Sequence, residues 1–523
     1  MLFNSIQFNH ATLLGALEQI GFEELTKSNH LLANTRHVNN ITLDSRKADK
    51  HCAFVALKGS TSDGYDYIDS AVDNGCTLIL SEKGLSQSTH ISASGQHYSV
   101  IAHPDLRAKL AELLSGLFEL NEGEISAVTG TNGKTSVASI NAQLSLGVHS
   151  KSACLGTLGL SLYSKENHEM FERILPVGAN TTPDIISHYK IFKYLQQAGV
   201  EDYSLEASSH GIEQGRLSGL PINIVAFTNL SQDHLDYHGN MVSYGQAKRG
   251  LLDVNSLKHL VLNADDEESL LWLQQKAPGT QLTWYSVEQN NLPQDTERYC
   301  LAQSLVYTPN GIEFDLSSSW GNAHVSLPLF GQFNVSNALA ALCIRLVKGE
   351  PFNTLIEQLQ KVKGVAGRME LFTHELPHAN IIVDYAHTPD ALSQALKSAK
   401  QHTRGRLFCV FGCGGNRDKT KRELMGAAAA KQSDVVVLTQ DNSRFEVPED
   451  IISDIESGIP ANTVVHTELE RKRAIRWAFK QSTETDLIVL AGKGHEDYME
   501  MKGQRIAYDE RAFVRHLISE EAA

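Results

Sequence analysis

The stretch of sequence that decides the fold is ISAVTGTNGKTS, residues 125–136. An apolar strand at 125–129 runs into a glycine-rich turn, and a helix is predicted from Thr135 to about Leu146. Glycines let backbone N–H groups approach phosphate oxygens, and the start of a helix adds a partial positive charge. Val128 stands where the full G-x-x-x-x-G-K-[ST] motif has its first glycine, so the sequence predicts a shortened phosphate loop.

The residues of this loop predict contacts to a nucleoside triphosphate and to a metal ion. Lys134 supplies a positive charge, and the hydroxyl of Thr135 is a ligand of the kind that Mg²⁺ accepts. A glycine-rich turn that binds nothing is the alternative, and the order of strand, loop and helix disfavours it. The predicted phosphate-contacting residues are Gly130, Thr131, Asn132, Gly133, Lys134, Thr135 and Ser136.

Length and composition exclude several classes of protein. The chain has 523 residues, more than one hydrophobic core usually serves, so about two to four domains are expected. A formal charge of -15 disfavours a general nucleic-acid binder. No apolar run reaches the roughly 18 residues of a membrane span, and the N-terminus lacks the basic leader of a signal peptide. The seven cysteines show no C-x-x-C spacing for zinc, so we expect a cytoplasmic protein with reduced cysteines.

The spacing of the apolar runs indicates three α/β parts. We place them at residues 1–105, 106–362 and 363–523. In the last part, helical segments alternate with apolar strands at 381–383, 407–411, 435–439 and 487–490. This alternation is typical of an open parallel sheet with helices on both faces, which binds ligands at the carboxyl ends of its strands. Polar groups follow each of the four ends, so the sequence predicts a binding rim there.

Two polar clusters follow predicted strands in the middle part. Glu206 lies in LEASSHG, residues 205–211, and NLSQDHLDYH, residues 229–238, follows a strand predicted at 222–227. A carboxylate and an imidazole at strand ends near a phosphate loop suit a second divalent ion. A single histidine there is more often structural, and only the density of Asp and His in the second cluster favours function. Lys248, taken alone, is an ordinary helix lysine with a solvated head.

Together the motifs resemble the Mur ligase family, in the family's order and over nearly the whole chain. They are TLDSR (42–46), GTNGKT (130–135), NTT (180–182), EASSH (206–210), NLSQDHLDYH (229–238), GRME (367–370), DYAHTP (384–389) and GKGHE (492–496). The resemblance implies an N-terminal α/β domain that binds the UDP end of a precursor. It further implies a central P-loop-type ATPase domain with a mainly parallel sheet, and a C-terminal Rossmann-like domain that brings an amino acid and closes on ATP.

The resemblance also implies where the UDP-linked muramoyl peptide binds. Ser60, Thr61 and Ser62 match the family by position alone. The predicted precursor-binding residues are Leu43, Ser45, Ser60, Thr61, Ser62, Asn180, Thr181, Thr182, Ser208, Gln214 and Arg216.

ATP and Mg²⁺ are the implied cofactors. Asn334, Asn337, Arg368 and Asp384 match positions that contact ATP, and the implied metal ligands are Thr135, Glu206, His234 and Lys248 as its carbamate. Lys248 matches the family's carbamylated lysine, and CO₂ turns its ammonium into an anion that can orient Mg²⁺. A guanidinium at Arg368 can stabilise charge as the γ-phosphoryl group moves. The predicted catalytic residues are Lys134, Glu206, His234, Lys248 and Arg368.

The choice of added amino acid is argued from Asp441-Asn442-Ser443-Arg444. Family members that add meso-diaminopimelate resemble one another in an Asp-Asn-Pro-Arg motif, and Ser443 stands where proline is usual. Loss of proline loosens the turn but keeps the guanidinium of Arg444, which can clamp the distal carboxylate that lysine lacks. Glu496 suits a distal ammonium. The predicted diaminopimelate-binding residues are Arg417, Asp441, Asn442, Ser443, Arg444, Gly492 and Glu496.

The implied reaction joins meso-diaminopimelate to the D-glutamate of UDP-N-acetylmuramoyl-L-alanyl-D-glutamate (UDP-MurNAc-L-Ala-D-Glu) through an acyl phosphate. We expect a monomer without nucleic-acid partners or membrane insertion. Three alternatives stay open: the same step with L-lysine, another amide ligase of this superfamily such as folylpolyglutamate synthetase, and a P-loop ATPase that ligates nothing.

Overall fold

The apolar runs that the sequence marks as strands are strands in the computed structural model. The structure describes residues 6–22, 35–59, 62–84, 87–120, 125–166, 169–174, 182–231, 233–287, 292–417 and 419–522. Three strands have the predicted bounds: β6 (Ile125–Thr129), β11 (Ile222–Phe227) and β19 (Leu407–Phe411). All three are buried along their length, as continuous apolar runs require in a sheet covered on both faces.

The chain divides into two compact units. One contains residues 1–131, 148–260 and 270–281, and the other contains residues 132–147, 261–269 and 282–523. Strand β12 (His259–Asn263) passes from the first unit into the second.

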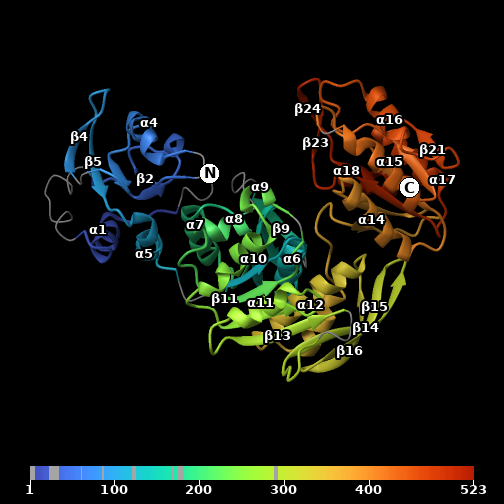
Figure 1. The fold of residues 1–523 in the computed structure, drawn as a ribbon, viewed down its shortest axis with the longest axis horizontal. Coiled ribbons are helices and arrows are strands. Elements are labelled where there is room, and N and C mark those ends of the chain that lie inside the picture. Colours follow the sequence, from blue (N-terminus) through green and yellow to red (C-terminus); the bar gives the residue numbers. More distant parts are fainter. Residues whose placement is uncertain are drawn as a thin grey trace. The chain divides into compact units, whose positions relative to one another are not determined.

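The N-terminal part of the first unit is a small α/β module whose sheet has the order β1-β2-β3-β5-β4. Only β4 runs antiparallel to its neighbour. Phe54, Ile79 and Val100 on the sheet pack against Ile68 and Val72 of helix α4. The elements, blue in Figure 1, are α1 (His10–Gln19), β1 (Asn40–Thr42), β2 (Cys52–Ala56), α4 (Ile68–Asp73), β3 (Leu78–Ser81), β4 (Gln87–Ile91), β5 (His97–Ala102) and α5 (Leu106–Phe118).

The rest of the first unit is built on strands in the order β11-β6-β10-β7-β8-β9. Strand β6 lies between β11 and β10, parallel to both, and the register pairs Val128 with Glu206 and Thr129 with Phe227. The carboxyl ends of β10 and β11 therefore flank the point where the phosphate loop begins. The remaining elements are β7 (Lys151–Gly156), β8 (Gly159–Ser164), β9 (Glu169–Ile174), α7 (Ile185–Gln197), β10 (Asp202–Glu206), α8 (Ser209–Glu213), α9 (Leu235–His238) and α10 (Met241–Arg249).

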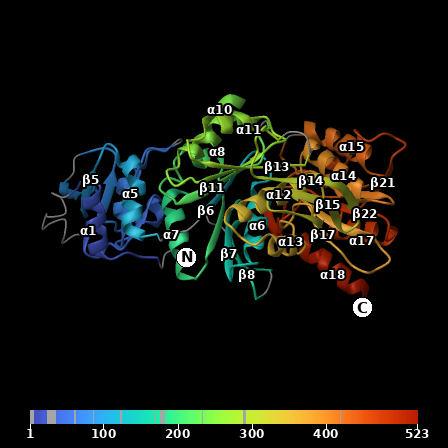
Figure 2. The same cartoon turned by 90° about the horizontal axis from the view of Figure 1, so that it is seen from below.

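In the second unit, helix α6 (Lys134–Ser145) follows the phosphate loop and begins one residue before its predicted start. It lies beside α12 (Gln332–Val347), as Figures 1 and 2 show, and the Nε of Arg345 donates to Oδ1 of Asn141 over 2.8 Å. Further elements are α13 (Phe352–Leu359) and the strands β13 (Gln281–Ser286), β14 (Tyr299–Thr308), β15 (Gly311–Ser318) and β16 (Gly321–Leu327), in the order β16-β15-β14-β13. Helix α11 (Glu268–Gln275) lies mostly in the first unit, which contains its residues from 270 onward.

The C-terminal part of the second unit is the predicted open sheet, with the order β17-β18-β22-β19-β20-β21. All its strands are parallel except β17. The elements are β17 (Glu370–Phe372), β18 (Asn380–Asp384), α14 (Pro389–His402), α15 (Thr420–Gln432), β20 (Val435–Leu438), α16 (Pro448–Glu456), β21 (Val464–Thr467), α17 (Arg471–Gln481), β22 (Leu487–Ala491), β23 (Tyr498–Met501), β24 (Gln504–Ala507) and α18 (Glu510–Ala522).

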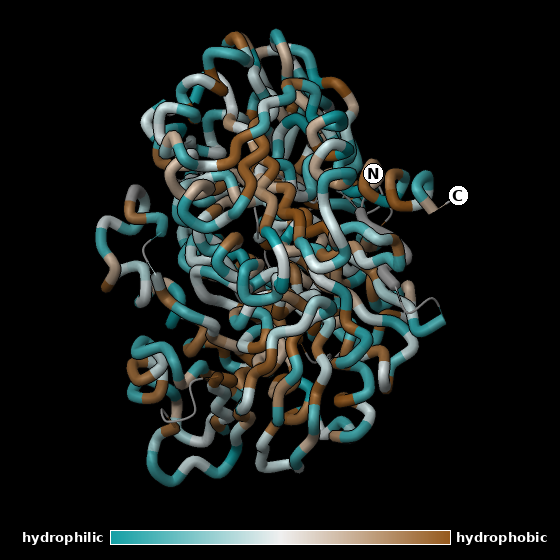
Figure 3. The backbone as a smooth tube through the Cα atoms, turned by 90° about the vertical axis from the view of Figure 1, so that its right-hand side faces the viewer, coloured by the Kyte–Doolittle hydropathy of each residue, from teal (hydrophilic) through white to brown (hydrophobic). Residues whose placement is uncertain are grey.

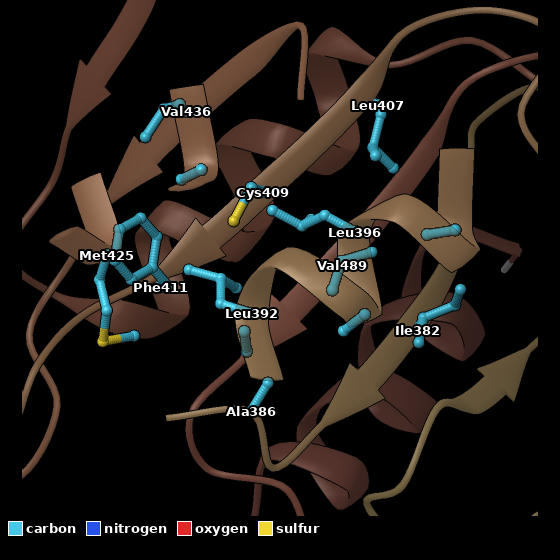
Figure 4. Close-up of a cluster of buried hydrophobic side chains, with 14 of the residues drawn as sticks. Ile382, Ala386, Leu392, Leu396, Leu407, Cys409, Phe411, Met425, Val436 and Val489 are labelled. Atoms are coloured by element: carbon cyan, nitrogen blue, oxygen red, sulfur yellow. The ribbon is translucent and has the colours of Figure 1, made fainter. Parts of the chain in front are cut away.

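Helices cover both faces of this sheet because successive strand residues point in opposite directions. Cys409 packs toward Leu392 and Leu396 of α14 in one cluster, shown in Figure 4. Phe408 and Val410 pack into the opposite cluster, with residues of α17 and α18. Figure 3 colours the backbone by hydropathy, and hydrophobic stretches (brown) alternate with hydrophilic ones (teal) along the chain.

Two further sequence-based expectations concern the whole chain. All seven cysteines are free and six are buried, in agreement with the prediction that they are reduced. No helix in the described part of the chain is long and apolar enough to cross a membrane.

Candidate active site

The start of the phosphate loop needs glycine for two reasons. Gly130 has a φ of +146°, and a Cβ there would lie 1.9 Å from Oγ1 of Thr228 at the end of the neighbouring strand. Thr131 ties the loop to the next segment: its N–H donates to the carbonyl of Asn229 over 2.8 Å, and its hydroxyl exchanges hydrogen bonds with the backbone of Ser231 over 2.9 and 3.1 Å. Thr131 therefore holds the loop against the segment that contains His234.

Lys248 is only 1% exposed, so its interpretation as a solvated helix lysine is wrong. Its Nζ donates to the carbonyl of Gly130 over 2.8 Å and lies 4.4 Å from the ring centroid of Tyr244, one helical turn earlier on α10. The hydroxyl of Tyr244 is 3.3 Å from that of Thr131. The buried amine of Lys248 is therefore placed against the first residue of the phosphate loop.

Glu206 ends strand β10 and is 3% exposed. Its carboxylate accepts the backbone N–H of Thr157 over 3.0 Å and the Thr157 hydroxyl over 3.1 Å. Gly156 makes room for it, since a Cβ at Gly156 would lie 1.9 Å from Oε1 of Glu206. The carboxylate is therefore fixed in position before any ligand arrives.

His234 and His238, predicted from the density of Asp and His in the sequence, both lie beside His210. The rings of His210 and His234 are 4.9 Å apart, and the ring of His210 is 4.1 Å from that of Tyr237 and 5.3 Å from that of His238. His234 has a φ of +52° at the start of α9, and its Nε2 lies 3.4 Å from a carboxylate oxygen of Asp233. Among the described residues, no group of three His, Cys, Asp or Glu side chains could hold a metal ion on its own.

Four predicted precursor-binding residues form one hydrogen-bonded chain. The hydroxyls of Thr182 and Ser208 are 2.9 Å apart, and Nη1 of Arg216 donates to the carbonyl of Thr182 over 2.6 Å. Nε of Arg216 donates to Oε1 of Gln214 over 3.0 Å, and Gln214 donates to the hydroxyl of Tyr237 over 3.2 Å. This series of hydrogen bonds therefore ends at Tyr237, beside the histidine cluster.

The other predicted precursor contacts lie in the N-terminal module or outside the described residues. Leu43 and Ser45 follow β1, and Ser62 follows β2, so they occupy the same edge of the parallel sheet. Ser45 is buried, and its carbonyl accepts Nδ2 of Asn74 over 3.0 Å. The predictions that lie outside the described residues are Ser60, Thr61, Asn180 and Thr181.

In the second unit, the predicted ATP contacts sit at helix starts and at one strand end. Gly133 has a φ of +86° and caps α6, so Lys134, Thr135 and Ser136 form the first turn, the part of a helix whose backbone N–H groups can bind an anion. On α12, the side-chain amide of Asn334 donates to the carbonyl of Phe330 over 2.8 Å. Nδ2 of Asn337 donates to Oδ1 of Asn334 over 3.1 Å. Both amides are thereby oriented.

Asp384 ends β18 and fixes the segment that carries Arg368. Its carboxylate accepts the N–H of Met369 over 2.7 Å and that of Ala386 over 2.8 Å. Burial raises the pKa of Asp384, and these two N–H donors oppose that shift. Arg368 itself is exposed, with its guanidinium carbon 4.9 Å from the ring centroid of Tyr385. Arg368 is therefore placed to meet a ligand, while its backbone is held.

The predicted rim of the C-terminal sheet exists, and a lysine with no assigned role lies at its centre. Lys493 is 0% exposed, and its Nζ donates to Oδ1 of Asn442 over 3.1 Å and to Glu496 over 2.8 Å, with Asp441 at 3.7 Å. Gly492 has a φ of +110°, and a Cβ there would lie 2.7 Å from Asp441. The loops after β20 and β22 are thus joined through one buried cation. Its sequence signal was a lysine between two glycines at a strand end.

Arg444 lies in the same rim, with a φ of +51°. Its Nε donates to the carboxylate of Glu500 over 3.0 Å, and its Nη1 donates to the carbonyl of Gly415 over 2.9 Å. Ser443 is buried, and its carbonyl accepts the N–H of Glu446 over 3.0 Å. Glu500 belongs to no recognised motif, so sequence reasoning had no means of finding it.

Arg417 is exposed in the loop after β19, and its neighbour Asn416 is held by Glu446. The Arg422 guanidinium, together with the N–H of Asn416, lowers the pKa of Glu446 to about 2. A second hydrogen bond joins the same two segments: the N–H of Phe445 donates to Oδ1 of Asn416 over 3.0 Å. The loops that carry Arg417 and Arg444 are therefore coupled through a charged network.

Comparisons with known proteins agree with this arrangement. The Mur ligase middle domain matches residues 128–345, the Mur ligase glutamate ligase domain matches 367–494, and the Mur ligase family catalytic domain matches 37–117. The curated UDP-N-acetylmuramoyl-L-alanyl-D-glutamate--2,6-diaminopimelate ligase of Vibrio vulnificus (strain YJ016) is 36% identical over 482 residues, covering 92% of this chain and 94% of that protein. The protein of the same description from Vibrio cholerae is 35% identical over 486 residues, with the same coverage.

Solved structures extend the likeness to the fold. A structure of a UDP-N-acetylmuramoyl-L-alanyl-D-glutamate--2,6-diaminopimelate ligase has a TM-score of 0.71 at 34% identity, and the match covers 92% of this chain and 95% of that one. The crystal structure of MurF from Acinetobacter baumannii has a TM-score of 0.57 at 16% identity, covering 94% and 98%, which is a likeness of fold alone. The predicted three-domain α/β fold with mainly parallel sheets is confirmed.

Proposed function

Because the chain belongs to the Mur ligase family, we propose that it is the ATP-dependent ligase that adds meso-diaminopimelate to UDP-MurNAc-L-Ala-D-Glu in peptidoglycan precursor synthesis. The observation that carries this proposal is the rim of the C-terminal sheet. There the guanidinium of Arg444 and the carboxylate of Glu496 stand on loops joined by Lys493. The distal end of diaminopimelate bears both a carboxylate and an ammonium, so a site that binds it needs one cationic and one anionic side chain.

The first step transfers the γ-phosphoryl group of ATP to the side-chain carboxylate of D-glutamate, giving an acyl phosphate and ADP. Lys134 and the N–H groups at the start of α6 hold the transferring phosphate, and Arg368 neutralises the charge that develops on its oxygens. Asn334 and Asn337 orient the nucleotide. Positioning and charge stabilisation supply most of the rate acceleration in such a transfer.

Glu206, His234 and Lys248 are the proposed metal-binding side chains of the first unit. A bound Mg²⁺ would neutralise phosphate and carboxylate oxygens. The fit rests on Glu206, a buried carboxylate that Thr157 holds in place. Lys248 fits as a carbamate, because its nitrogen keeps one hydrogen for the carbonyl of Gly130 while the new carboxylate brings negative charge.

The second step is attack of a diaminopimelate amine on the carbonyl carbon of the acyl phosphate. The C–N bond forms, the C–O bond to phosphate breaks, and the amine gives up a proton as the amide appears. Thr182, Ser208, Gln214 and Arg216 are proposed to hold the muramoyl peptide, with Asn180 and Thr181 beside them. Leu43, Ser45 and the segment 60–62 are proposed to contact the uridine nucleotide.

The chain is further proposed to act in the cytoplasm as a monomer, with domain boundaries near residues 105 and 362. The boundaries rest on the motif order and on the matched family domains, residues 37–117, 128–345 and 367–494.

Mass spectrometry of the product tests the function. Purified protein is incubated with Mg-ATP, UDP-MurNAc-L-Ala-D-Glu and either meso-diaminopimelate or L-lysine. We expect the diaminopimelate tripeptide, formed together with stoichiometric phosphate. Addition of lysine alone would transfer the assignment to the lysine-adding step, and phosphate release without either substrate would support an ATPase that ligates nothing.

A further inference from the structure

The loop that carries Arg444 is bound to the hairpin of β23 and β24. The N–H of Arg444 donates to the carbonyl of Glu500 over 2.9 Å, and the N–H of Lys502 donates to the carbonyl of Arg444 over 2.5 Å. The N–H of Glu500 donates to Oδ1 of Asn442 over 2.8 Å. Arg444 and Met501 also form an isolated parallel bridge. The hairpin therefore serves as a support for the predicted amino-acid site.

Glu500 adds its side chain to this support. Its carboxylate oxygen accepts Nε of Arg444 over 3.0 Å, with the two side chains 27% and 18% exposed. Nη1 of Arg444 donates to the carbonyl of Gly415 over 2.9 Å and approaches that of Asn442 at 3.5 Å. Among the residues that the structure describes, this guanidinium makes its hydrogen bonds through Nε and Nη1, which leaves Nη2 for a ligand. The side chain of Arg444 is thus held at Nε and at Nη1.

We propose that Glu500 is a positioning residue for amino-acid selection: it orients Arg444 so that Nη2 meets the distal carboxylate of the incoming amino acid. This inference rests on the proposed function, because it assumes that Arg444 contacts that carboxylate. An arginine side chain has several rotatable bonds, so a free guanidinium spends little time in any one orientation. A carboxylate at Nε restricts those rotations before the substrate binds, which lowers the entropy lost on binding.

Two features favour Glu500 in this role over a general contribution to stability. The ion pair is partly exposed, and pairs of that kind contribute little to folding. The backbone hydrogen bonds between the loop and the hairpin do not need the side chain, so they persist when it is removed. The consequence of removing Glu500 should therefore appear in the binding of the distal carboxylate.

The test compares Glu500→Ala and Glu500→Gln with wild type in steady-state tripeptide formation. For Glu500→Ala we expect a KM for diaminopimelate raised about tenfold, the size of one lost charge-assisted hydrogen bond. The kcat and the KM values for ATP and UDP-MurNAc-L-Ala-D-Glu should stay within about twofold. Glu500→Gln keeps an acceptor for Nε and should recover most of the lost affinity.

L-lysine supplies the discriminating readout because it lacks the distal carboxylate. If L-lysine is a slow substrate, its kcat/KM should be the same in Glu500→Ala as in wild type. If it is a competitive inhibitor, its inhibition constant should be the same in both proteins. Gln504→Ala, on the exposed face of the same hairpin, is the matched control. An unchanged KM for diaminopimelate, or an equal weakening for lysine, would overturn the inference while leaving the function intact. Wild-type protein that forms no diaminopimelate tripeptide would instead refute the proposed function.

Discussion

Gly156→Ala adds one methyl group, and we expect it to disable the enzyme by moving Glu206. The new Cβ would stand 1.9 Å from Oε1 of Glu206, where real contacts are at least 3.0 Å, so the carboxylate must retreat by about 1.1 Å. That displacement breaks its hydrogen bonds to the N–H and hydroxyl of Thr157, now 3.0 and 3.1 Å long. The φ of Gly156 is not in the left-handed region, so alanine costs nothing in backbone strain.

A misplacement of about 1 Å at a catalytic group lowers the rate by about 100-fold, or about 2.7 kcal/mol in the activation barrier. We therefore expect kcat/KM for tripeptide formation by Gly156→Ala to fall by about that factor. The assay measures product by chromatography over a range of Mg²⁺ concentrations, with thermal unfolding to verify that the variant is folded. The concentration of Mg²⁺ that gives half the maximal rate should rise.

Two further variants separate this explanation from a general effect of replacing glycine. Gly15→Ala, in the interior of α1, meets no atom within 4 Å and should leave activity unchanged while stabilising the fold by up to about 1 kcal/mol. Glu206→Asp shortens the carboxylate, so the double variant Gly156→Ala, Glu206→Asp should be faster than Gly156→Ala alone. A folded Gly156→Ala protein with wild-type kcat/KM would refute the reasoning.

Three other predictions follow from buried or paired charges. Arg471 and Glu510 form an ion pair, and both side chains are 0% exposed. Arg471→Met should therefore lower the free energy of unfolding, measured by urea denaturation, by about 3 to 5 kcal/mol, and adding Glu510→Leu should recover most of that loss. A loss below about 1 kcal/mol would contradict this prediction. The pKa of Glu446 is lowered to about 2 by Arg422, so its stabilisation is present above the unfolded value of about 4.3 and is lost as pH falls toward 2. The melting temperature of Glu446→Gln should fall less than that of wild type between pH 5 and 2, and parallel curves would count against this. Lys248→Arg keeps a cation but cannot carry a carbamate, so tripeptide formation should drop by about 100- to 1,000-fold, whereas near-normal turnover would exclude the carbamate.

The phosphate loop and the strands were predictable because their causes are local. An apolar run, glycines with positive φ and a helix start lie within about a dozen residues, and the bounds of β6 and β19 were exact. The gathering of polar groups on one rim was predictable for a similar reason, since parallel strands place their carboxyl ends at one edge.

The contacts within the site were not predictable in this way. Lys248 looked like a surface lysine, and only the fold buries it beneath the carbonyl of Gly130, 118 positions away. Glu206 depends on Thr157, and Arg444 depends on Glu500, 56 positions further along the chain. Such pairs carry no periodicity and no fixed spacing, so the sequence around each residue says nothing of its partner.

By itself, the sequence determined the fold class, the phosphate loop, the family resemblance and the candidate residues on the rim of the C-terminal sheet. Tertiary structure alone decided which of those residues are buried and which oxygens and nitrogens already have partners. It also decided which residues without a predicted role, Lys493 within a motif and Glu500 outside the motifs, complete the network. The physical reason is that backbone conformation follows from neighbours in sequence, whereas burial and charge pairing follow from neighbours in space.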